Sequence, residues 1–463
     1  MEALYELRLR LGIQSAPLSG EPPEEDTLNH SRANDAPLRP LTLDLSESLS
    51  LSLTSLLKQR ELLGVARTSA IGQRLIPTSS LGPLQESSSR VYSGQFSDDG
   101  SLFYSATHNN MVHIYKVDGN MGFTKHKAIR GGQFRWTITD CAMTTDNRFL
   151  AHSSITPVIY LAHVDGSEQQ SIPIKLSEDF GLGIWSVRFS HDSREIVVGT
   201  NSGTIIVYDL QSQRKVNEYM AHSSDINSVC FADATAPNVI FSGSDDTFVK
   251  VWDRRMFSSD TCGVLSGHSE GITFVSSKND GRNCISNGKD QTLRLWDIRK
   301  MHTGESAVRA CKIETRSGFD YRWHGYRFVP GSRKHPMDCS VATYMGHRVL
   351  HTLIRCYFSP LHTTGQRFIY TGSSNGRIHI FDSHDTSTSK PVHVFSAIPK
   401  RFRRLHEPHH DPYSSFDPTS DPNICTRDVS WHPYLPFIIS SNWGTITPGT
   451  AGSLGLHTFR RSC

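Results

Sequence analysis

Short runs of apolar and β-branched residues recur along most of this chain. From about residue 90 onward each run is only a few residues long, and clusters of Gly, Asp, Ser and Asn separate one run from the next. Such a pattern predicts antiparallel strands joined by tight turns, because β-branched residues favour strands and the intervening residues favour turns. The chain is therefore expected to be all-β over most of its length.

The runs form an internal repeat when the chain is divided at the aromatic residues that end its strands. Two strands, VKVWD and LRLWD, end in Trp252-Asp253 and Trp296-Asp297. A Trp-Asp pair that recurs at a strand end every ~40–45 residues is typical of a β-propeller blade. Seven units can be recognised, and seven blades can close a ring that leaves only short strand edges unpaired. They begin near residues 90, 136, 184, 222, 268, 346 and 427. We therefore predict a seven-bladed WD-repeat β-propeller.

Three segments precede the repeat and form an N-terminal disordered and helical extension with its linker. Residues 1–41 are rich in Pro, charged and small polar residues, which predicts disorder. Residues 42–64 place leucines at helical spacing, although part of this stretch also alternates Leu and Ser as a strand would. We favour a helix, which either caps the domain or binds a groove of a partner. Residues 65–89 are expected to be a linker that can take part in closing the ring.

The predicted propeller spans residues 90–463 and contains two long insertions. Residues 300–345 include the aromatic and arginine-rich segment GFDYRWHGYRF, and residues 384–426 are rich in Ser, Pro, His and Asp. Loops of this length are usually functional or disordered. We expect the first insertion to order itself on the ring and the second to be mobile.

The last unit is irregular. Its sequence SSNWGTITPGTAGSLGLHTF places Pro448, Gly449 and Gly452 where a regular final strand is expected. Two explanations stay open at this stage. Either the ring closes through the N-terminal segment and a late strand at LGLHTF, or this end of the chain is abnormal.

Two units carry the same set of four polar side chains at matching positions. A histidine, a serine, an aspartate and a tryptophan are spaced so that they can form one buried hydrogen-bonded chain. The two sets are His222, Ser242, Asp246 and Trp252, and His268, Ser286, Asp290 and Trp296. A catalytic reading of these histidines and aspartates is disfavoured because the sets recur with the repeat, so we predict that they lock the blades.

An arginine follows each Trp-Asp pair at the second position. Arg255 follows Asp253, and Arg299 follows Asp297. Each arginine lies where the strand leaves its blade, so both should project from one face of the ring beside a carboxylate. Two such pairs on neighbouring blades suit bidentate polar recognition of a partner protein. The alternative is that the arginines only form ion pairs within their own blades.

Composition narrows the class of protein. The 463 residues leave room for a propeller of roughly 300 residues with flanking segments. A net charge of +3 is small for this length and argues against direct nucleic-acid binding. No apolar run approaches the ~18 residues of a membrane helix, so no membrane association is expected. Nine cysteines without a Cys-x-x-Cys motif indicate reduced thiols in the cytosol or nucleus.

Catalytic chemistry finds little support in the sequence. His406-Glu407-Pro408-His409-His410 satisfies the H-E-x-x-H pattern, but zinc proteases need it on a helix, which Pro408 opposes. Phosphate-binding motifs and nucleophile–base pairs are not recognisable. We therefore predict no catalytic residues, no metal site and no cofactor. The basic cluster Lys400–Arg404 is taken as a solvated loop, with a nuclear-import signal as the alternative.

Several segments together resemble a known family. SGSDDTFVKVWDRR, GHSEGITFVSSKNDGRNCISNGKDQTLRLWDIRK, FDYRW and YMGHRVLHTLIRCYFSPLHTTGQRFIYTGSSNGRI are similar to the cullin-4-associated factors of WD-repeat protein 23 type. The resemblance is dense over residues 184–382 and at TRDVSWHP, thinner over 56–183, and absent before about residue 42. The insertion at 384–426 is longer than that family's pattern, and the last blade also departs from it.

The resemblance implies a function. Members of this family are substrate receptors of cullin-4 RING ubiquitin ligases, and their WD-x-Arg boxes contact the propeller-shaped adaptor that links receptor to cullin. Asp253, Arg255, Asp297 and Arg299 would make that contact here, and the helix at 42–64 would add a second one. The chain would be a non-enzymatic receptor, in the nucleus and cytoplasm, that presents a protein substrate for ubiquitination and proteasomal turnover. The alternative is a scaffold of a chromatin or RNA-processing complex unrelated to ubiquitin.

Overall fold

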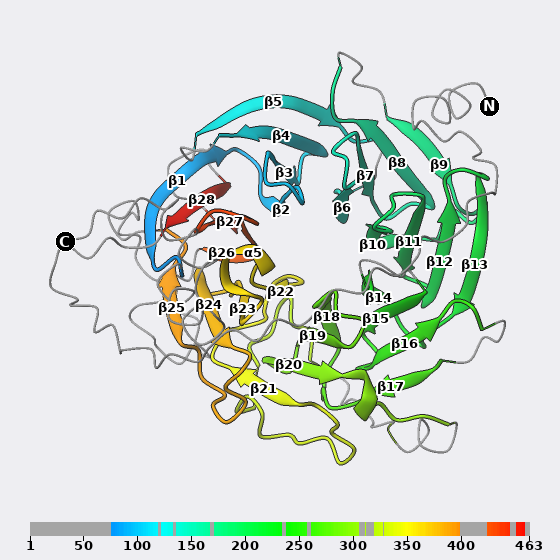
Figure 1. The fold of residues 1–463 in the computed structure, drawn as a ribbon, viewed down its shortest axis with the longest axis vertical. Helices are drawn as coiled ribbons and strands as arrows, with labels where there is room; N and C mark the ends of the chain where they lie inside the picture. The colour runs from blue at the N-terminus through cyan, green and yellow to red at the C-terminus, as the bar shows by residue number, and fades with distance from the viewer. Residues whose placement is uncertain are drawn as a thin grey trace, which may run out of the picture. The chain divides into compact units, whose positions relative to one another are not determined.

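The described part of the protein contains seven four-stranded antiparallel sheets. They are arranged in a ring (Figure 1). The structure is a computed structural model. It describes residues 76–118, 122–132, 136–166, 171–233, 238–256, 261–304, 311, 319–326, 328–398, 424–444 and 451–458. The prediction of a seven-bladed, almost entirely β-stranded propeller is confirmed. The predicted disordered segment at 1–41 and helix at 42–64 lie outside the described residues.

The first four blades follow one another along the chain. Blade one consists of β2 (Val91–Phe96), β3 (Leu102–Thr107), β4 (Met111–Val117) and β5 (Phe123–Arg130). Blade two consists of β6 (Asp140–Met143), β7 (Phe149–Ser153), β8 (Val158–His163) and β9 (Ile172–Lys175). Blade three consists of β10 (Ile184–Phe189), β11 (Glu195–Thr200), β12 (Thr204–Asp209) and β13 (Arg214–Met220). Blade four consists of β14 (Ile226–Phe231), β15 (Val239–Ser244), β16 (Val249–Asp253) and β17 (Gly263–Leu265).

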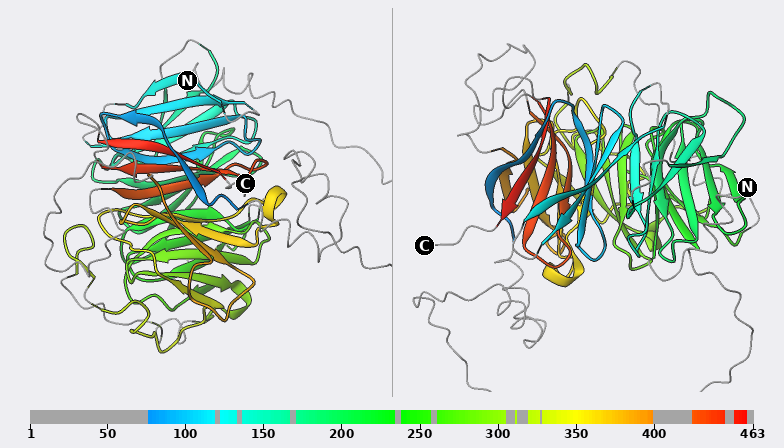
Figure 2. Two further views of the ribbon diagram at one scale, coloured as in Figure 1. Left: turned by 90° about the vertical axis from the view of Figure 1, so that its left-hand side faces the viewer. Right: turned by 90° about the horizontal axis from the view of Figure 1, so that it is seen from above.

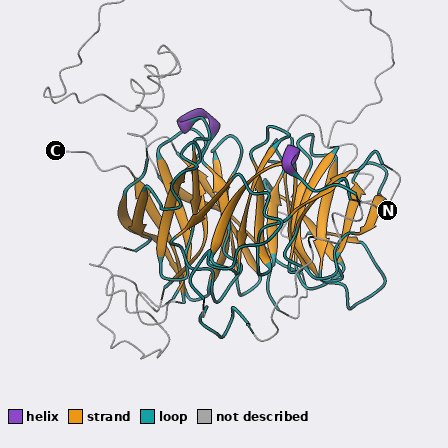
Figure 3. Ribbon diagram, turned by 90° about the horizontal axis from the view of Figure 1, so that it is seen from below, coloured by secondary structure: helices purple, strands orange, loops and turns teal. Residues whose placement is uncertain are grey.

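The remaining blades contain the insertions and the closure. Blade five consists of β18 (Ile272–Ser277), β19 (Asn283–Gly288), β20 (Thr292–Asp297) and β21 (Ala342–Met345). Blade six consists of β22 (Cys356–Phe358), β23 (Phe368–Thr371), β24 (Arg377–Asp382) and β25 (His393–Ser396). Blade seven consists of β26 (Cys425–Trp431), β27 (Phe437–Trp443), β28 (Gly452–Thr458) and β1 (Ser79–Ser87). The short helix α5 (Leu361–Thr364) and the 3-10 helix η1 (Ile298–Lys300) lie on the same face of the disc (Figure 3).

The ring closes through its N-terminal strand. β1 pairs with β28 in antiparallel register, from Ser79 opposite Thr458 to Ser87 opposite Gly452. β28 contains the LGLHT sequence, so the first of the two explanations for the irregular last unit is the one that the structure adopts. β1 lies within residues 65–89, the segment that was expected to be a linker able to take part in closing the ring. Because β1 is the outer strand of blade seven, the propeller begins before the predicted residue 90.

Both predicted insertions are shorter than the sequence suggested. β21, at the end of the 300–345 segment, is the outer strand of blade five, and its register places Leu295 opposite Ala342. β25 lies within the 384–426 segment and is the outer strand of blade six, with Ile380 opposite His393. These outer strands were not recognised because they are short and lie at the edge of a blade, where one side needs no apolar pattern.

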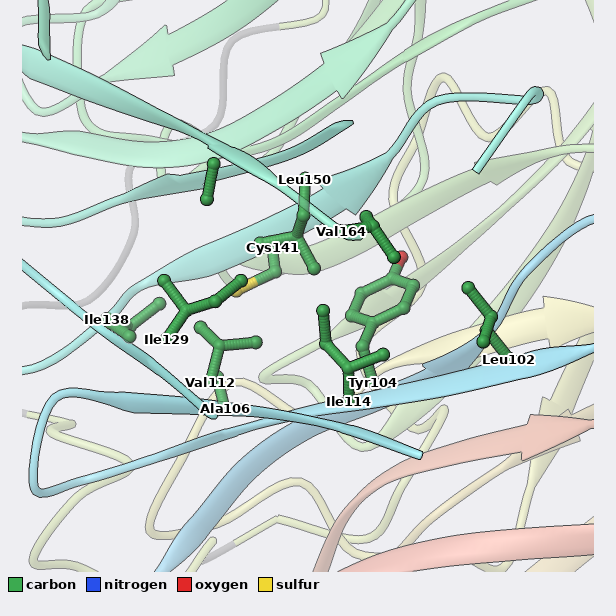
Figure 4. Packing of buried hydrophobic residues seen from close by; sticks show 11 residues of the cluster. Leu102, Tyr104, Ala106, Val112, Ile114, Ile129, Ile138, Cys141, Leu150 and Val164 are labelled. Carbon is green, nitrogen blue, oxygen red and sulfur yellow. The ribbon is translucent and has the colours of Figure 1, made fainter. Parts of the chain in front are cut away.

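The hydrophobic core lies between the blades, because each sheet buries both of its faces against its neighbours. Figure 4 shows this arrangement between blades one and two. Ile114 and Ile129 of blade one and Leu150 of blade two are fully buried there. The edge-on views of Figure 2 show the blades side by side around the disc. Helices long and apolar enough to cross a membrane do not occur among the described residues.

The two polar sets form hydrogen-bonded chains within blades four and five. In blade four, His222 Nδ1 lies 2.8 Å from Asp246 Oδ2, His222 Nε2 lies 2.7 Å from Ser242 Oγ, and Trp252 Nε1 donates to the same Oγ at 2.9 Å. In blade five, His268 reaches Asp290 at 3.1 Å and Ser286 at 2.7 Å, and Trp296 donates to Ser286 at 2.7 Å. Burial lowers the pKa of His222, which favours the neutral imidazole. Each set joins the second and third strands of its blade, the turn between them and the loop that precedes the blade.

Candidate protein-binding surfaces

The WD-x-Arg box of blade four presents an exposed arginine held by its own aspartate. Asp253 ends β16, and its Oδ1 accepts the Arg255 backbone N–H at 3.0 Å and the side-chain Nε–H at 2.9 Å. Arg255 Nη2 donates to Asp253 Oδ2 at 2.6 Å. The side chain of Arg255 is 68% exposed. Hydrogen bonds from Arg255 lower the pKa of Asp253, so the carboxylate stays charged and fixes the guanidinium.

The box of blade five has the same geometry and one additional arginine. Arg299 Nη2 donates to Asp297 Oδ2 at 3.0 Å, and the side chain of Arg299 is 65% exposed. Arg282, which precedes β19, donates from Nη2 to the same oxygen at 2.8 Å. The carboxylate of Asp297 is nearly buried between the two guanidinium groups. This box therefore carries one more positive charge than the box of blade four.

The two boxes occupy equivalent positions of neighbouring blades. Each follows the third strand of its sheet, β16 or β20, which lie next to each other around the ring in Figure 1. After Arg299 the chain passes to blade four, where His302 and Val264 of β17 exchange backbone hydrogen bonds of 2.8 and 2.9 Å. The structure thus places both arginines, exposed, on one face of the ring and ties the segment after Arg299 to blade four.

A deep cavity opens on the opposite face. It has a volume of about 1160 Å³ and includes Asp245 and Lys289 among its lining residues. These two residues lie in the turns after the second strands of blades four and five, whereas the WD-x-Arg boxes follow the third strands. Because neighbouring strands are antiparallel, the two kinds of turn lie at opposite ends of the blade. The cavity and the arginines therefore occupy opposite faces.

Part of the first insertion contributes to the wall of this cavity. Tyr321 accepts a hydrogen bond from the His351 backbone N–H to its carbonyl oxygen at 2.7 Å. Lys289 lies over the ring of Tyr321, 4.2 Å from its centroid. Trp323, two residues further on, also lines the cavity and is 81% exposed. Residues 321–323 of the 300–345 insertion therefore pack on the ring beside the cavity.

The floor of the cavity is a buried network of charged side chains. Asp140 accepts hydrogen bonds from Arg188 and, at 2.8 Å, from Arg355 Nη2. Arg355 Nη1 also lies 3.4 Å from Asp428 Oδ2, and Gln95 donates to Asp428 at 3.0 Å. These residues come from the inner strands of five blades or the turns beside them. The network is referred to below as the channel plug.

Groups of three or more His, Cys, Asp or Glu side chains that could hold a metal ion do not occur in the part of the chain that the structure describes. The eight cysteines within the described ranges are all free. The motif at 406–410 and the basic cluster at 400–404 lie outside those ranges.

Three features of these surfaces were missed from the sequence. The role of Arg282 could have been predicted, because this residue precedes Asn283, which pairs with Asp297 across the sheet. The WD-x-Arg motif does not include Arg282. The cavity-lining Trp136 and Trp185 were taken only as the starts of repeat units. No local sequence pattern indicates the channel plug, because its members are dispersed from blade one to blade seven.

Comparisons with known proteins agree with this architecture. Residues 156–269 match the model of the nucleolar protein 10-like N-terminal domain, and residues 259–297 match the WD domain, G-beta repeat. The chain is 41% identical to the LEC14B homolog of Prunus armeniaca, over 81% of this chain and 74% of that protein. It is 39% identical to the LEC14B protein of Lithospermum erythrorhizon, over 89% and 85%.

A further relative carries a functional name. The DDB1- and CUL4-associated factor 11 homolog of Caenorhabditis elegans is 32% identical, over 76% of this chain and 59% of that protein. These identities extend over most of the chain and agree with the resemblance drawn from its WD-x-Arg boxes and flanking motifs. The chain therefore belongs to the family of WD-repeat propeller proteins that includes the LEC14B proteins and the homologues of DDB1- and CUL4-associated factor 11.

Proposed function

We propose that this protein is a substrate receptor of a cullin-4 RING ubiquitin ligase and docks on the DDB1 adaptor through its two WD-x-Arg boxes. The observation that carries the proposal is the pair of exposed arginines, Arg255 and Arg299, each fixed by its own aspartate on one face of neighbouring blades. The names of the factor 11 homologues support the choice of adaptor and cullin.

The geometry of the boxes suits docking by rigid polar groups. A guanidinium that is already hydrogen-bonded to a carboxylate loses little side-chain entropy when a partner binds it. The remaining N–H groups of Arg255 and Arg299 face solvent and can donate to acceptors of the adaptor. Arg282 reinforces Asp297 and so should help to hold the box of blade five.

The opposite face would receive the substrate. A cavity of about 1160 Å³ with charged and aromatic walls can hold a segment of a protein. The chain would then contribute to ubiquitination only by bringing the substrate near the other subunits of the ligase. In this assignment the protein is non-catalytic, and we propose that it acts in the nucleus and cytoplasm.

The double substitution Arg255→Ala with Arg299→Ala is expected to abolish co-purification with DDB1. Truncating a desolvated charged contact costs about 2 kcal/mol or more, which weakens binding roughly 30-fold for each arginine. Both side chains are mostly exposed, so the fold should be unaffected. The measurement is a pull-down with purified DDB1, followed by titration.

A matched control is available on the same face. Arg148 and Arg194 lie in the turns after the first strands of blades two and three, and each pairs with an aspartate two residues earlier. Their side chains are 58% and 60% exposed. Arg148→Ala with Arg194→Ala should leave DDB1 binding intact. Wild-type binding by the Arg255/Arg299 variant would contradict the docking assignment.

A second candidate function is a scaffold of a nuclear chromatin or RNA-processing complex. The match of residues 156–269 to the nucleolar protein 10-like domain favours it. Identification of the proteins that co-purify with the intact chain separates the two functions. Recovery of DDB1 and a cullin supports the receptor, and recovery of a nucleic-acid complex without them supports the scaffold.

A further inference from the structure

One wall of the cavity is formed by two tryptophans whose rings are nearly perpendicular. Trp136, in the segment between blades one and two, and Trp185 of β10 have ring centroids 6.2 Å apart and an interplanar angle of 84°. Both line the cavity. Trp136 is 43% exposed although it is a large apolar side chain. Exposed tryptophan faces attract cations through the negative charge of their π systems.

A carboxylate lies at the edge of this pair of rings. Asp225 Oδ2 accepts a hydrogen bond from Trp185 Nε1 at 3.0 Å. The ion pairs between described residues include none that involves Asp225. Its neighbour Asp245 is the partner of Lys289, whose Nζ lies 2.7 Å from Asp245 Oδ1. Two carboxylates therefore share one ammonium group, which leaves this part of the wall with a negative charge.

The environment of Asp225 disfavours its negative charge in the free protein. Burial raises the pKa of this carboxyl, and the nearby charge of Asp245 raises it further. The hydrogen bond from Trp185 and the charge of Lys289 act in the opposite direction but do not offset these effects. A second cation beside Asp225 would stabilise the negative charge of its carboxylate.

The other cationic side chains that line the cavity are already engaged. Arg322 pairs with Asp320 at 2.6 Å. Arg90 lies over the ring of Trp443, 5.1 Å from its centroid. Arg427 is buried over the ring of Tyr92 and donates to the Tyr92 carbonyl oxygen. A further cation beside Asp225 would therefore have to come from a ligand.

Exposed apolar side chains lie in the segments next to this wall. Phe180, in the segment between blades two and three, is 85% exposed, and Ile155, in the turn after β7, is 37% exposed. Ile155 is close to Gly183, where an added Cβ would lie 2.9 Å from its Cγ2. A ligand that places a cation beside Asp225 can therefore contact apolar surface in these segments.

We propose that the wall formed by Trp136, Trp185 and Asp225 binds an arginine or lysine side chain of the substrate, with an apolar substrate residue next to it. This inference rests on the proposed function only in calling the bound peptide a substrate segment. The carboxylate supplies the charge, the tryptophan pair contacts the aliphatic stem and the cationic head, and the peptide backbone stays at the mouth of the cavity.

The test is selection of random nonapeptides on the immobilised full-length protein. We expect the selected peptides to share an arginine or lysine with an apolar neighbour. Asp225→Asn should weaken binding of a selected peptide by about 10-fold or more, because it removes a charge-assisted contact. Trp136→Ala should weaken it by about 3- to 30-fold, and Trp136→Phe should restore most of the loss.

The control is Glu178→Gln, which makes the same change of charge on the same face. Glu178 lies in the segment between β9 and β10, and its side chain is 89% exposed. Peptides that share an acidic residue, a selection without a shared residue, or equal binding by Asp225→Asn and Glu178→Gln would each overturn the proposal.

The result of the peptide selection can be distinguished from the result of the DDB1-binding test. Asp225 lies on the face opposite Arg255, so the Asp225→Asn variant should co-purify with DDB1 as the unchanged protein does. If peptide selection succeeds while DDB1 does not bind, the cation site stands and the receptor function fails. If DDB1 binds and no basic residue is selected, the receptor function stands and the cation site fails.

Discussion

Asp140→Asn is expected to lower the free energy of unfolding by about 3–5 kcal/mol, because it leaves the buried Arg355 and the partly buried Arg188 without their shared carboxylate. Asp140 is 1% exposed. Its two oxygens accept hydrogen bonds from Arg188 Nη1, from Arg355 Nη2 at 2.8 Å, and from the Val187 backbone N–H at 3.0 Å. Burial by itself raises the pKa of this carboxyl, but the charges of Arg188 and Arg355 more than offset it, so the net pKa is lowered.

The expected loss follows from the position of Arg355. This side chain is 4% exposed and lies between Asp140 and Asp428. Both Arg355 and Arg188 also lie over the ring of Phe274, at 5.3 and 5.7 Å from its centroid. When the charge of Asp140 is removed, two guanidinium groups in a confined space keep only one facing carboxylate. Removing one partner of a buried pair is costly because the other charge stays desolvated.

Denaturant unfolding followed by circular dichroism measures this effect. The control is Asp192→Asn, whose carboxylate is half exposed and lies 3.9 Å from Arg194; it should change stability by less than about 0.5 kcal/mol. Adding Arg188→Met to Asp140→Asn should recover part of the loss, because it removes one unpaired charge. Equal stability of Asp140→Asn and the unchanged protein would show that the channel plug does not stabilise the ring.

The second large effect is a loss of stability as the pH falls below about 6.5. Burial lowers the pKa of His152, His347 and His432 to about 4, and that of His379 and His457 to about 3. In the unfolded chain these imidazoles regain their ordinary pKa of about 6.5. Below that value the unfolded state binds more protons than the folded state, so protonation favours unfolding.

The sign and the size of this stability change follow from the same pKa shifts. The stability contributed by these neutral histidines is fully present above pH 6.5 and is lost as the pH falls toward 4. Each histidine costs up to about 1.4 kcal/mol for each pH unit in that window. Five of them approach the whole stability of a typical domain, about 5–15 kcal/mol, within one or two pH units.

Unfolding free energies measured at pH 7.5, 6.5 and 5.5 test this expectation. His379→Leu provides the matched variant, because both ring nitrogens of this buried histidine lack a hydrogen-bond partner among the described residues. We expect the variant to be at least as stable as the unchanged protein at pH 7.5 and to lose less stability between pH 6.5 and 5.5. A stability that does not change between pH 7.5 and 5.5 would contradict the prediction.

The blade pattern was recognisable in the sequence because it is local and repeated. Each third strand that ends in Trp-Asp is flanked by turn residues, and the recurrence of Trp252 and Trp296 with their histidine, serine and aspartate partners indicated the same blade twice. The WD-x-Arg boxes were recognisable for the same reason, because Asp253 and Arg255 lie only two residues apart. Local spacing is sufficient to predict a side-chain contact when a side chain and its partner belong to one turn.

The outer strands could not be predicted with the same certainty. β1 has the sequence SSLGPLQES, in which Gly82 and Pro83 oppose a regular strand. Among the described strands it pairs with β28 alone, and its register is irregular between Ser80 and Gly82 and between Pro83 and Gln85. An edge strand tolerates proline because one side of its backbone needs no partner. β1 is a strand because it pairs with the edge of β28 that its other neighbour, β27, leaves open.

The sequence by itself determined the number of blades, the polar sets that lock blades four and five, and the arginines that end two third strands. Only the tertiary structure decided how the ring closes, which charges meet at the channel plug, and where the cavity lies relative to the arginines. The physical reason is distance along the chain. Asp140, Arg355 and Asp428 come from blades two, six and seven, and they meet only because β1 and β28 join the two ends of the propeller into one ring.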